Sequence, residues 1–248
     1  MPPLLLALDY GGTKLSAAIT ERGAREWLAL ERIFLPHAKN AHAEQTALLA
    51  LARKMLAGKT PAAIGVSFGG PVDAERGIVL LSHHVAGWEN ISLRDQLRHA
   101  LRAPVAMDND ANVACWGEFW SGAGREVDSM CCLTLGTGVG GGIVVFGRLL
   151  RGPDGTAAEI GHMNVCRDGR ACNCGAKGCL EAYASVTGMV RTAVEGIEAG
   201  RGTLLTKMCR GDFERIDGKM VSDAIALGDE FAAWVMNETA AWLGTGIA

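Results

Sequence analysis

Long apolar segments and an excess of basic residues are both missing from this sequence of 248 residues. No stretch reaches the roughly 18 uncharged apolar residues that a membrane-spanning helix needs, and residues 1–9 lack the basic region of a signal peptide. Lys and Arg number 24 against 27 Asp and Glu, so the formal net charge is -3. This balance excludes a nucleic-acid binder that works through bulk charge. We therefore expect no membrane and no nucleic acid among the partners.

Signs of secretion are also missing, although the chain has eight cysteines. Without a secretory context these cysteines do not indicate a disulfide framework, so we expect reduced thiols and a cytoplasmic protein. Five of them stand in apolar or mixed surroundings and are typical of packing residues: Cys115, Cys131, Cys132, Cys166 and Cys209.

Glycine, in contrast, is abundant: the 33 glycines are roughly twice the average usage. No collagen-like period or low-complexity run explains them. They gather instead in clusters, at residues 11–12, 69–70 and 136–142. Clustered glycines in a globular chain indicate backbone that approaches another group closely.

Strands and helices alternate along the first part of the chain. Apolar patterning predicts strands at residues 4–8, 15–20, 62–68 and 104–107 and helices at residues 43–56 and from 93 onward. Ser92 and Asp95 have the spacing of a capping box at the start of the last of these helices. The alternation favours an α/β layer.

The order strand, glycine-rich turn, strand occurs twice, at residues 4–20 and again at 130–146. We expect residues 136–142 to form a loop, residues 152–179 to be irregular, and helices to follow from about 180 and about 222. This repeated order predicts two similar halves that face each other across a cleft. We place these lobes at residues 1–112 and 113–248.

The two glycine-rich turns are candidate phosphate loops. The first, residues 9–14, fits neither the spacing nor the context of a P-loop, and the second matches G-x-G-x-x-G but continues into a strand at 143–146, where a dinucleotide fold would begin a helix. Backbone N–H groups of such turns can still hold an anion, assisted by the hydroxyls of Thr13 and Thr137. Asp9 could hold Mg²⁺ and Lys14 could meet phosphate charge. The alternative is that both turns are merely tight hairpins.

A cluster of acids and amides occupies residues 108–112, where a predicted strand meets a predicted helix. A carboxylate at such a strand end can accept the proton of a hydroxyl that attacks a phosphoryl group. Helix capping is the alternative, since Asp and Asn are favoured N-caps. Two acids and two amides in five residues exceed what one cap requires.

A metal site is predicted by the spacing H-x9-C-x-C-x4-C. The four residues are His162, Cys172, Cys174 and Cys179. One imidazole and three thiolates form a closed tetrahedral set for structural Zn²⁺. Redox chemistry is the alternative, but C-x-C is not the C-x-x-C of thiol oxidoreductases.

These motifs together resemble the ROK family of repressors and sugar kinases within the actin-like ATPase superfamily, over nearly the whole chain. The resemblance implies an α/β, two-lobed actin-like (ribonuclease H-like) fold with a structural zinc loop. It implies ATP and Mg²⁺ at the two phosphate motifs, with these contacts: Asp9, Gly11, Gly12, Thr13, Lys14, Gly136, Thr137, Gly138 and Gly140. It implies Asp110 as the general base. It also implies a sugar site formed by Gly70, Asn109, Asp110, Glu159, His162 and Glu181.

Two departures from the family pattern matter. Residues 83–86 read His-His-Val-Ala where many family glucokinases have Pro-Asn-Leu before Gly-Trp, which removes an expected sugar-contacting Asn. Beyond Ala248 the family usually continues with a further strand, an adenosine-contacting motif and closing helices. We therefore expect a chain truncated at its C-terminus.

The resemblance implies an ATP-dependent hexose kinase that phosphorylates the 6-hydroxyl, with glucose as the first expectation and N-acetylated hexosamines as the second. Two alternatives remain: a sugar-binding ROK-type regulator, and an inactive sugar-binding remnant. Apolar content in the two C-terminal helical stretches favours a homodimer.

Overall fold

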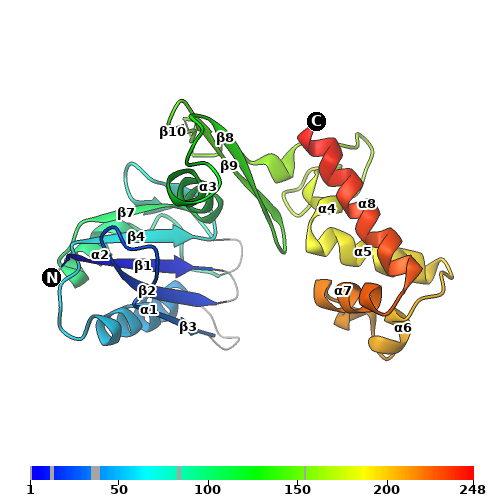
Figure 1. Ribbon diagram of the computed structural model, residues 1–248, viewed down its shortest axis with the longest axis horizontal. Coiled ribbons are helices and arrows are strands. Elements are labelled where there is room, and N and C mark those ends of the chain that lie inside the picture. The colour runs from blue at the N-terminus through cyan, green and yellow to red at the C-terminus, as the bar shows by residue number, and fades with distance from the viewer. Residues whose placement is uncertain (1, 12–13, 35–39, 83–84, 154) are drawn as a thin grey trace. The chain divides into compact units, whose positions relative to one another are not determined.

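The computed structural model describes residues 2–11, 14–34, 40–82, 85–153 and 155–248 (Figure 1). Backbone contacts divide the chain into two compact units, Met1–Cys131 with Gly142–Ala157, and Cys132–Gly141 with Ala158–Ala248. The lobe boundary expected after residue 112 remains a prediction. The units are divided differently: residues 113–131 and Gly142–Ala157 belong to the first unit, and Cys132–Gly141 to the second.

A five-stranded sheet forms the framework of the first unit. Its order is β3-β2-β1-β4-β7, with β1 antiparallel to β2, β2 antiparallel to β3, and β1, β4 and β7 mutually parallel. The strands span Leu4–Tyr10 (β1), Leu15–Glu21 (β2), Ala29–Ile33 (β3), Ala63–Phe68 (β4) and Val105–Asn109 (β7). The parallel strands therefore end at one edge, where ligands commonly bind in α/β sheets.

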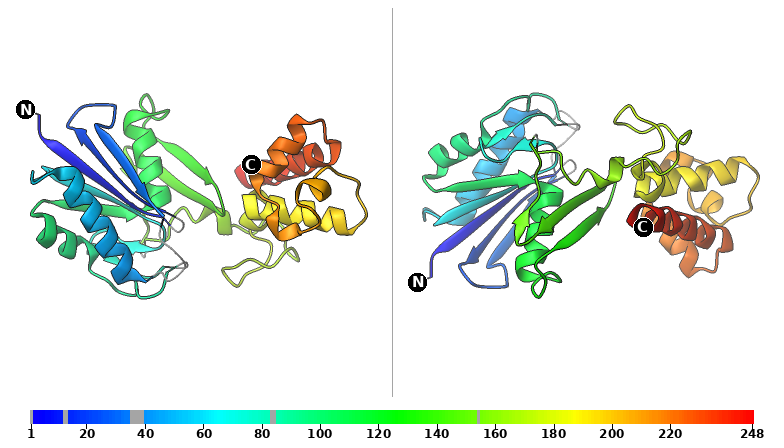
Figure 2. Two further views of the ribbon diagram at one scale, coloured as in Figure 1. Left: turned by 90° about the horizontal axis from the view of Figure 1, so that it is seen from below. Right: turned by 90° about the horizontal axis from the view of Figure 1, so that it is seen from above.

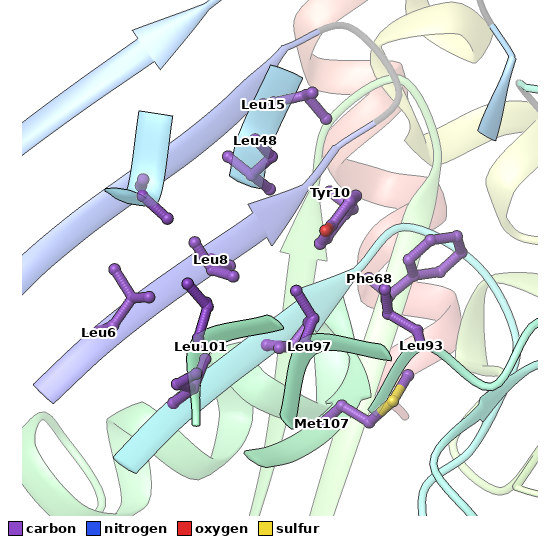
Figure 3. Close-up of a cluster of buried hydrophobic side chains, with 14 of the residues drawn as sticks. Leu6, Leu8, Tyr10, Leu15, Leu48, Phe68, Leu93, Leu97, Leu101 and Met107 are labelled. Carbon is purple, nitrogen blue, oxygen red and sulfur yellow. The ribbon is translucent and has the colours of Figure 1, made fainter. Parts of the chain in front are cut away.

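One face of this sheet is buried beneath two helices, α1 (Ala41–Leu56) and α2 (Leu93–Leu101). Every second residue of β1 points into this core, and apolar residues three or four apart on each helix meet them (Figure 3). The core includes Leu6, Leu8, Tyr10, Leu48, Phe68, Leu93, Leu97 and Leu101. Both helices were predicted from this spacing. Helix α2 begins as expected, but the Ser92 side chain forms no capping hydrogen bond.

The rest of the first unit consists of short elements. Helix α3 (Asp110–Ser121) follows β7 directly, as the sequence predicted. A two-stranded sheet pairs β5 (Val72–Asp73) with β6 (Ile78–Val79). Strand β10 (Arg148–Leu149) pairs with β9 (Val139–Val145), which in turn pairs with β8 (Met130–Leu135).

The hairpin of β8 and β9 corrects one expectation about the glycines. Residues 136–142 were expected to form a loop, but β9 begins at Val139, so only residues 136–138 form the turn. The glycines inside β9 permit close packing. A methyl group on Gly142 would collide with the Cys115 side chain, and one on Gly141 would collide with Ile160.

The second unit is built mainly of helices that pack on one another, as both views of Figure 2 show. Their bounds are Glu181–Ala184 (α4), Val186–Glu198 (α5), Leu205–Met208 (α6), Gly218–Ala226 (α7) and Glu230–Ile247 (α8), with 3-10 turns at Ile160–His162 and Phe213–Arg215. Their core includes Met189, Leu205, Val221, Phe231 and Val235. The segment between residues 163 and 180 is irregular, as predicted. Among the described residues, no helix is long and apolar enough to cross a membrane.

Candidate functional site

A row of polar side chains crosses the sheet of the first unit on the face opposite to its core. Strand register pairs Arg32 with Ser16, Ser16 with Asp9, Asp9 with Ser67, and Ser67 with Asp108. Register partners in adjacent strands point to the same side of a sheet. All five line one groove of about 550 Å³. The sheet thus presents charged and hydroxyl groups side by side near the ends of its parallel strands.

Asp9 lies at the centre of this row. Its Oδ1 accepts a hydrogen bond from the Ser67 hydroxyl at 2.9 Å, and its Oδ2 lies 3.5 Å from the Ser16 hydroxyl. These contacts fix the carboxylate, yet each oxygen keeps a further lone pair. A carboxylate held in this way fits Mg²⁺, which prefers oxygen ligands.

The predicted catalytic stretch opens helix α3. Asn109 is the N-cap, because its Oδ1 accepts from the backbone N–H groups of Ala111 and Asn112. Its Nδ2 donates to the Gly70 carbonyl at 3.2 Å, which brings two predicted sugar-site residues together. The alternative of helix capping therefore applies to Asn109.

Asp110 follows the cap as the first residue of the helix. Its Oδ1 accepts from the Ala111 N–H at 2.8 Å, and a methyl group added to Gly69 would lie 3.6 Å from its Oδ2. The side chain keeps contact with solvent, but the protein packed around the carboxyl raises its pKa, and the Asp9 carboxylate raises it further. A carboxylate with a raised pKa is a better proton acceptor than an ordinary one.

An ion pair that sequence reasoning missed supports this stretch. Asp108 is 7% exposed, and its Oδ2 accepts from Arg151 Nε at 2.7 Å. Its Oδ1 accepts from Asn112 Nδ2 at 2.9 Å and from the Asn109 N–H at 2.9 Å. The buried carboxylate thereby ties the end of β7 to the first turn of α3. No linear signal links Arg151 with a residue 43 positions away.

The first phosphate motif is described only in part. Gly12 and Thr13 lie outside the described residues. At Gly11 an added methyl group would lie 2.9 Å from the Lys14 carbonyl oxygen, so the close approach of the chain requires glycine. Lys14 is exposed just before β2.

The turn of the β8–β9 hairpin holds the predicted second phosphate motif. The Gly136 N–H donates to the Gly138 carbonyl at 3.0 Å, and Gly140 lies just inside β9. Beside the turn, the Val139 N–H donates to Glu181 Oε2 at 2.9 Å. A methyl group on Gly138 would collide with that carboxylate. Thr137 is exposed at the tip.

The four predicted metal ligands converge in the second unit. The ligand atoms of His162, Cys172, Cys174 and Cys179 all lie within 4.8 Å of one another. The sulfurs of Cys174 and Cys179 are 3.7 Å apart, and Cys172 Sγ is 3.7 Å from His162 Nδ1. A tetrahedron with Zn–S bonds of about 2.3 Å has edges of about 3.8 Å. The donor set and its spacing therefore fit zinc.

The thiol environments agree with a metal site. An N–H from Ala176 lowers the pKa of Cys174, which favours the thiolate that a metal needs. Burial raises the pKa of Cys179 to about 12, and a bound cation would favour its thiolate. Turn hydrogen bonds between Cys172 and the Gly175–Ala176 segment fold the loop back on itself.

One predicted sugar-site residue, His162, belongs to this cluster, and two others, Glu159 and Glu181, lie beside it. His162 turns Nδ1 toward Cys172, while its Nε2 lies 3.9 Å from Glu159 Oε2. Glu181 Oε1 lies 3.9 Å from Cys172 Sγ. Partners of this kind orient metal-bound histidines in proteins. The second unit thus brings Glu159, His162 and Glu181 together, whereas Gly70, Asn109 and Asp110 come together in the first.

The chain is similar to known proteins over its whole length. It matches the model of the ROK family over residues 5–248. It is 36% identical over 252 residues to a glucokinase of Thermotoga maritima, covering 100% of this chain and 78% of that protein.

Two solved structures agree with this match. A ROK family glucokinase from Streptomyces griseus, in complex with glucose and AMPPNP, has a TM-score of 0.83 at 36% identity, over 98% of this chain and 78% of that one. A ROK family transcriptional regulator, a homologue of the Escherichia coli MLC protein, has a TM-score of 0.85 at 28% identity, over 98% of this chain and 61% of that one. The same fold therefore serves an enzyme and a regulator.

Proposed function

Because this chain belongs to the ROK family, we propose that it transfers the γ-phosphoryl group of ATP to the 6-hydroxyl of a hexose, with glucose as the first substrate. Membership confirms the resemblance seen in the sequence, and with it the α/β fold class of the actin-like sugar kinases. Glucose and ATP are supported by the glucokinase relatives and by the neighbour bound to glucose and AMPPNP.

The observation that carries the proposal is the carboxylate of Asp110 at the head of α3. Its raised pKa, due to the protein packed around the carboxyl group and then to Asp9, suits a general base. In the proposed reaction Asp110 accepts the proton of the sugar hydroxyl as that oxygen attacks the γ-phosphorus. Proton acceptance by a positioned group typically contributes 10²–10⁴ in rate.

The remaining residues bind and orient. Asn109, Gly70, Glu159, His162 and Glu181 are proposed to hold the sugar hydroxyls, since paired polar groups discriminate strongly between substrates. The proposed nucleotide contacts are Asp9, Gly11, Gly12, Thr13, Lys14, Gly136, Thr137, Gly138 and Gly140. Asp9 would hold Mg²⁺, which neutralises phosphate charge. His162, Cys172, Cys174 and Cys179 would hold structural Zn²⁺, which fixes the loop.

The proposed setting is the cytoplasm, where thiols stay reduced. This agrees with the eight cysteines, all of them described by the structure and none of them in a disulfide. We further propose a homodimer, supported by large apolar side chains exposed on the second unit, among them Trp234 and Ile247. Sedimentation of the purified chain measures its oligomeric state directly.

A coupled ADP-release assay over a panel of hexoses tests the proposed activity. We expect turnover with ATP to be highest for glucose and to require Asp110. The relation to the transcriptional regulator favours sugar sensing as the second candidate function. Glucose binding by calorimetry without ADP release from any hexose would reject the kinase and favour the sensor.

A further inference from the structure

The segment that follows the last metal ligand holds the turn of the second phosphate motif. The Val186 N–H donates to the Gly136 carbonyl at 2.9 Å. The Thr187 hydroxyl donates to the Thr137 carbonyl at 2.8 Å. Two consecutive carbonyls of the turn are therefore bound by two consecutive residues at the start of helix α5.

These two hydrogen bonds also orient the amides of the turn. In a trans peptide the N–H points opposite to the C=O of the same unit. Because the carbonyls of Gly136 and Thr137 face α5, the N–H groups of Thr137 and Gly138 point away from it. Successive N–H groups directed to one side form an anion-binding concavity. The bonds from Val186 and Thr187 therefore direct two amides toward an incoming phosphate.

The third peptide of the turn is bound by Glu181. Its Oε2 accepts from the Val139 N–H at 2.9 Å, and its Oε1 lies 3.9 Å from Cys172 Sγ. Glu181 stands two residues after Cys179 in the chain. The metal cluster is thus connected to the segment that binds the turn in two ways. The segment follows Cys179 directly in the chain, and the Glu181 side chain lies beside Cys172.

We propose that Thr187 is a positioning residue for nucleotide binding, and that the metal cluster fixes the segment 181–187 that holds the phosphate turn. This inference rests on the proposed kinase function. In the proposed reaction, Thr187 contacts no reacting atom. It acts through the backbone amides of Thr137 and Gly138, so its loss should weaken nucleotide binding and leave sugar binding unchanged.

Calorimetry on the metal-loaded chain tests the role of Thr187. Thr187→Val removes the hydroxyl and keeps the shape, and Thr187 is exposed, so the fold should be preserved. We expect affinity for ADP to fall roughly three- to tenfold, the worth of one hydrogen bond, with glucose affinity unchanged. Thr187→Ser should restore ADP affinity. Thr239→Val is the matched control, because the Thr239 hydroxyl bonds only within its own helix, to the Val235 carbonyl.

Hydrogen exchange followed by mass spectrometry tests the role of the metal. Chelation should accelerate exchange in residues 132–141 while β1, at residues 4–10, stays protected. Unchanged protection of the hairpin, or unchanged ADP affinity in Thr187→Val, would overturn this inference alone. A wild-type chain that binds no ADP would instead overturn the proposed function. The two failures are therefore distinguishable.

Discussion

Removing the charge of Arg151 should destabilise the first unit, because its partner is buried. The Asp108 side chain is 10% exposed and the Arg151 side chain 45% exposed. Breaking a fully buried ion pair costs about 3–5 kcal/mol, since an unpaired charge is left behind. Because the Arg151 side chain is half-exposed, water can take part of its place beside Asp108 in the variant. Asp108 also keeps its hydrogen bonds from two other donors. We therefore expect Arg151→Met to cost about 2 kcal/mol.

Urea and thermal unfolding followed by circular dichroism measure this cost. For a chain of this size, 2 kcal/mol corresponds to a fall in Tm of about 4–8 °C. Lys54→Met is the matched control, because Lys54 and Glu31 form an ion pair whose side chains are 71% and 43% exposed. Exposed pairs contribute about 0–1 kcal/mol, so this variant should lose no more than about 4 °C relative to wild type.

A double-mutant cycle identifies the cause of the destabilisation. In an Asp108→Asn background no buried charge remains, so Arg151→Met should cost less than half of its effect in the wild type. An equal loss of stability in both backgrounds would show that Arg151 stabilises the unit through the packing of its aliphatic stem and not through its charge. An Arg151→Met variant as stable as the Lys54→Met control would refute the reasoning altogether.

Other variants test the proposed active site. Asp110→Asn should lower kcat by about 10²–10⁴ while glucose affinity stays within about twofold in calorimetry; near-normal turnover would exclude Asp110 as the base. Burial and then Asp9 raise the pKa of Asp110, so stability is lost as pH rises through that pKa. Thermal melts should therefore find Asp110→Asn more stable than wild type near pH 7, and equal to it below about pH 4. Gly138→Ala should raise KM for ATP, because its methyl group displaces Glu181, whereas Gly117→Ala meets nothing within 4 Å and should not.

The sequence predicted those helices and strands in which buried and exposed residues recur with a clear period. Strand β1 and helix α1 follow the expected ranges within two residues, because their apolar residues face one core. Strand β3 was not predicted. It lies at the sheet edge and is half-exposed along its length, so it carries no apolar alternation that a sequence pattern could reveal.

Sites whose residues lie close together in the sequence were easier to predict than contacts between residues far apart in the sequence. The predicted metal ligands lie within 18 residues of one another, and turns between them suffice to bring them together. The contact of Thr187 with Thr137 spans 50 residues and ends on a backbone carbonyl, which has no sequence signature at all. Residue identity therefore indicated candidate groups for the chemistry, and only the fold revealed which other groups hold them in place.

Core packing explains why Asp9 points toward the groove. Leu6, Leu8 and Tyr10 are buried against the helices, and successive side chains of a strand alternate between faces, so Asp9 must point to the other face. A shift of one residue in strand register would bury the carboxylate and expose three large apolar side chains. The core that stabilises the sheet thus also specifies the register of Asp9 beside Ser67. A substitution that loosens this core should therefore reduce catalysis even where it touches no polar residue.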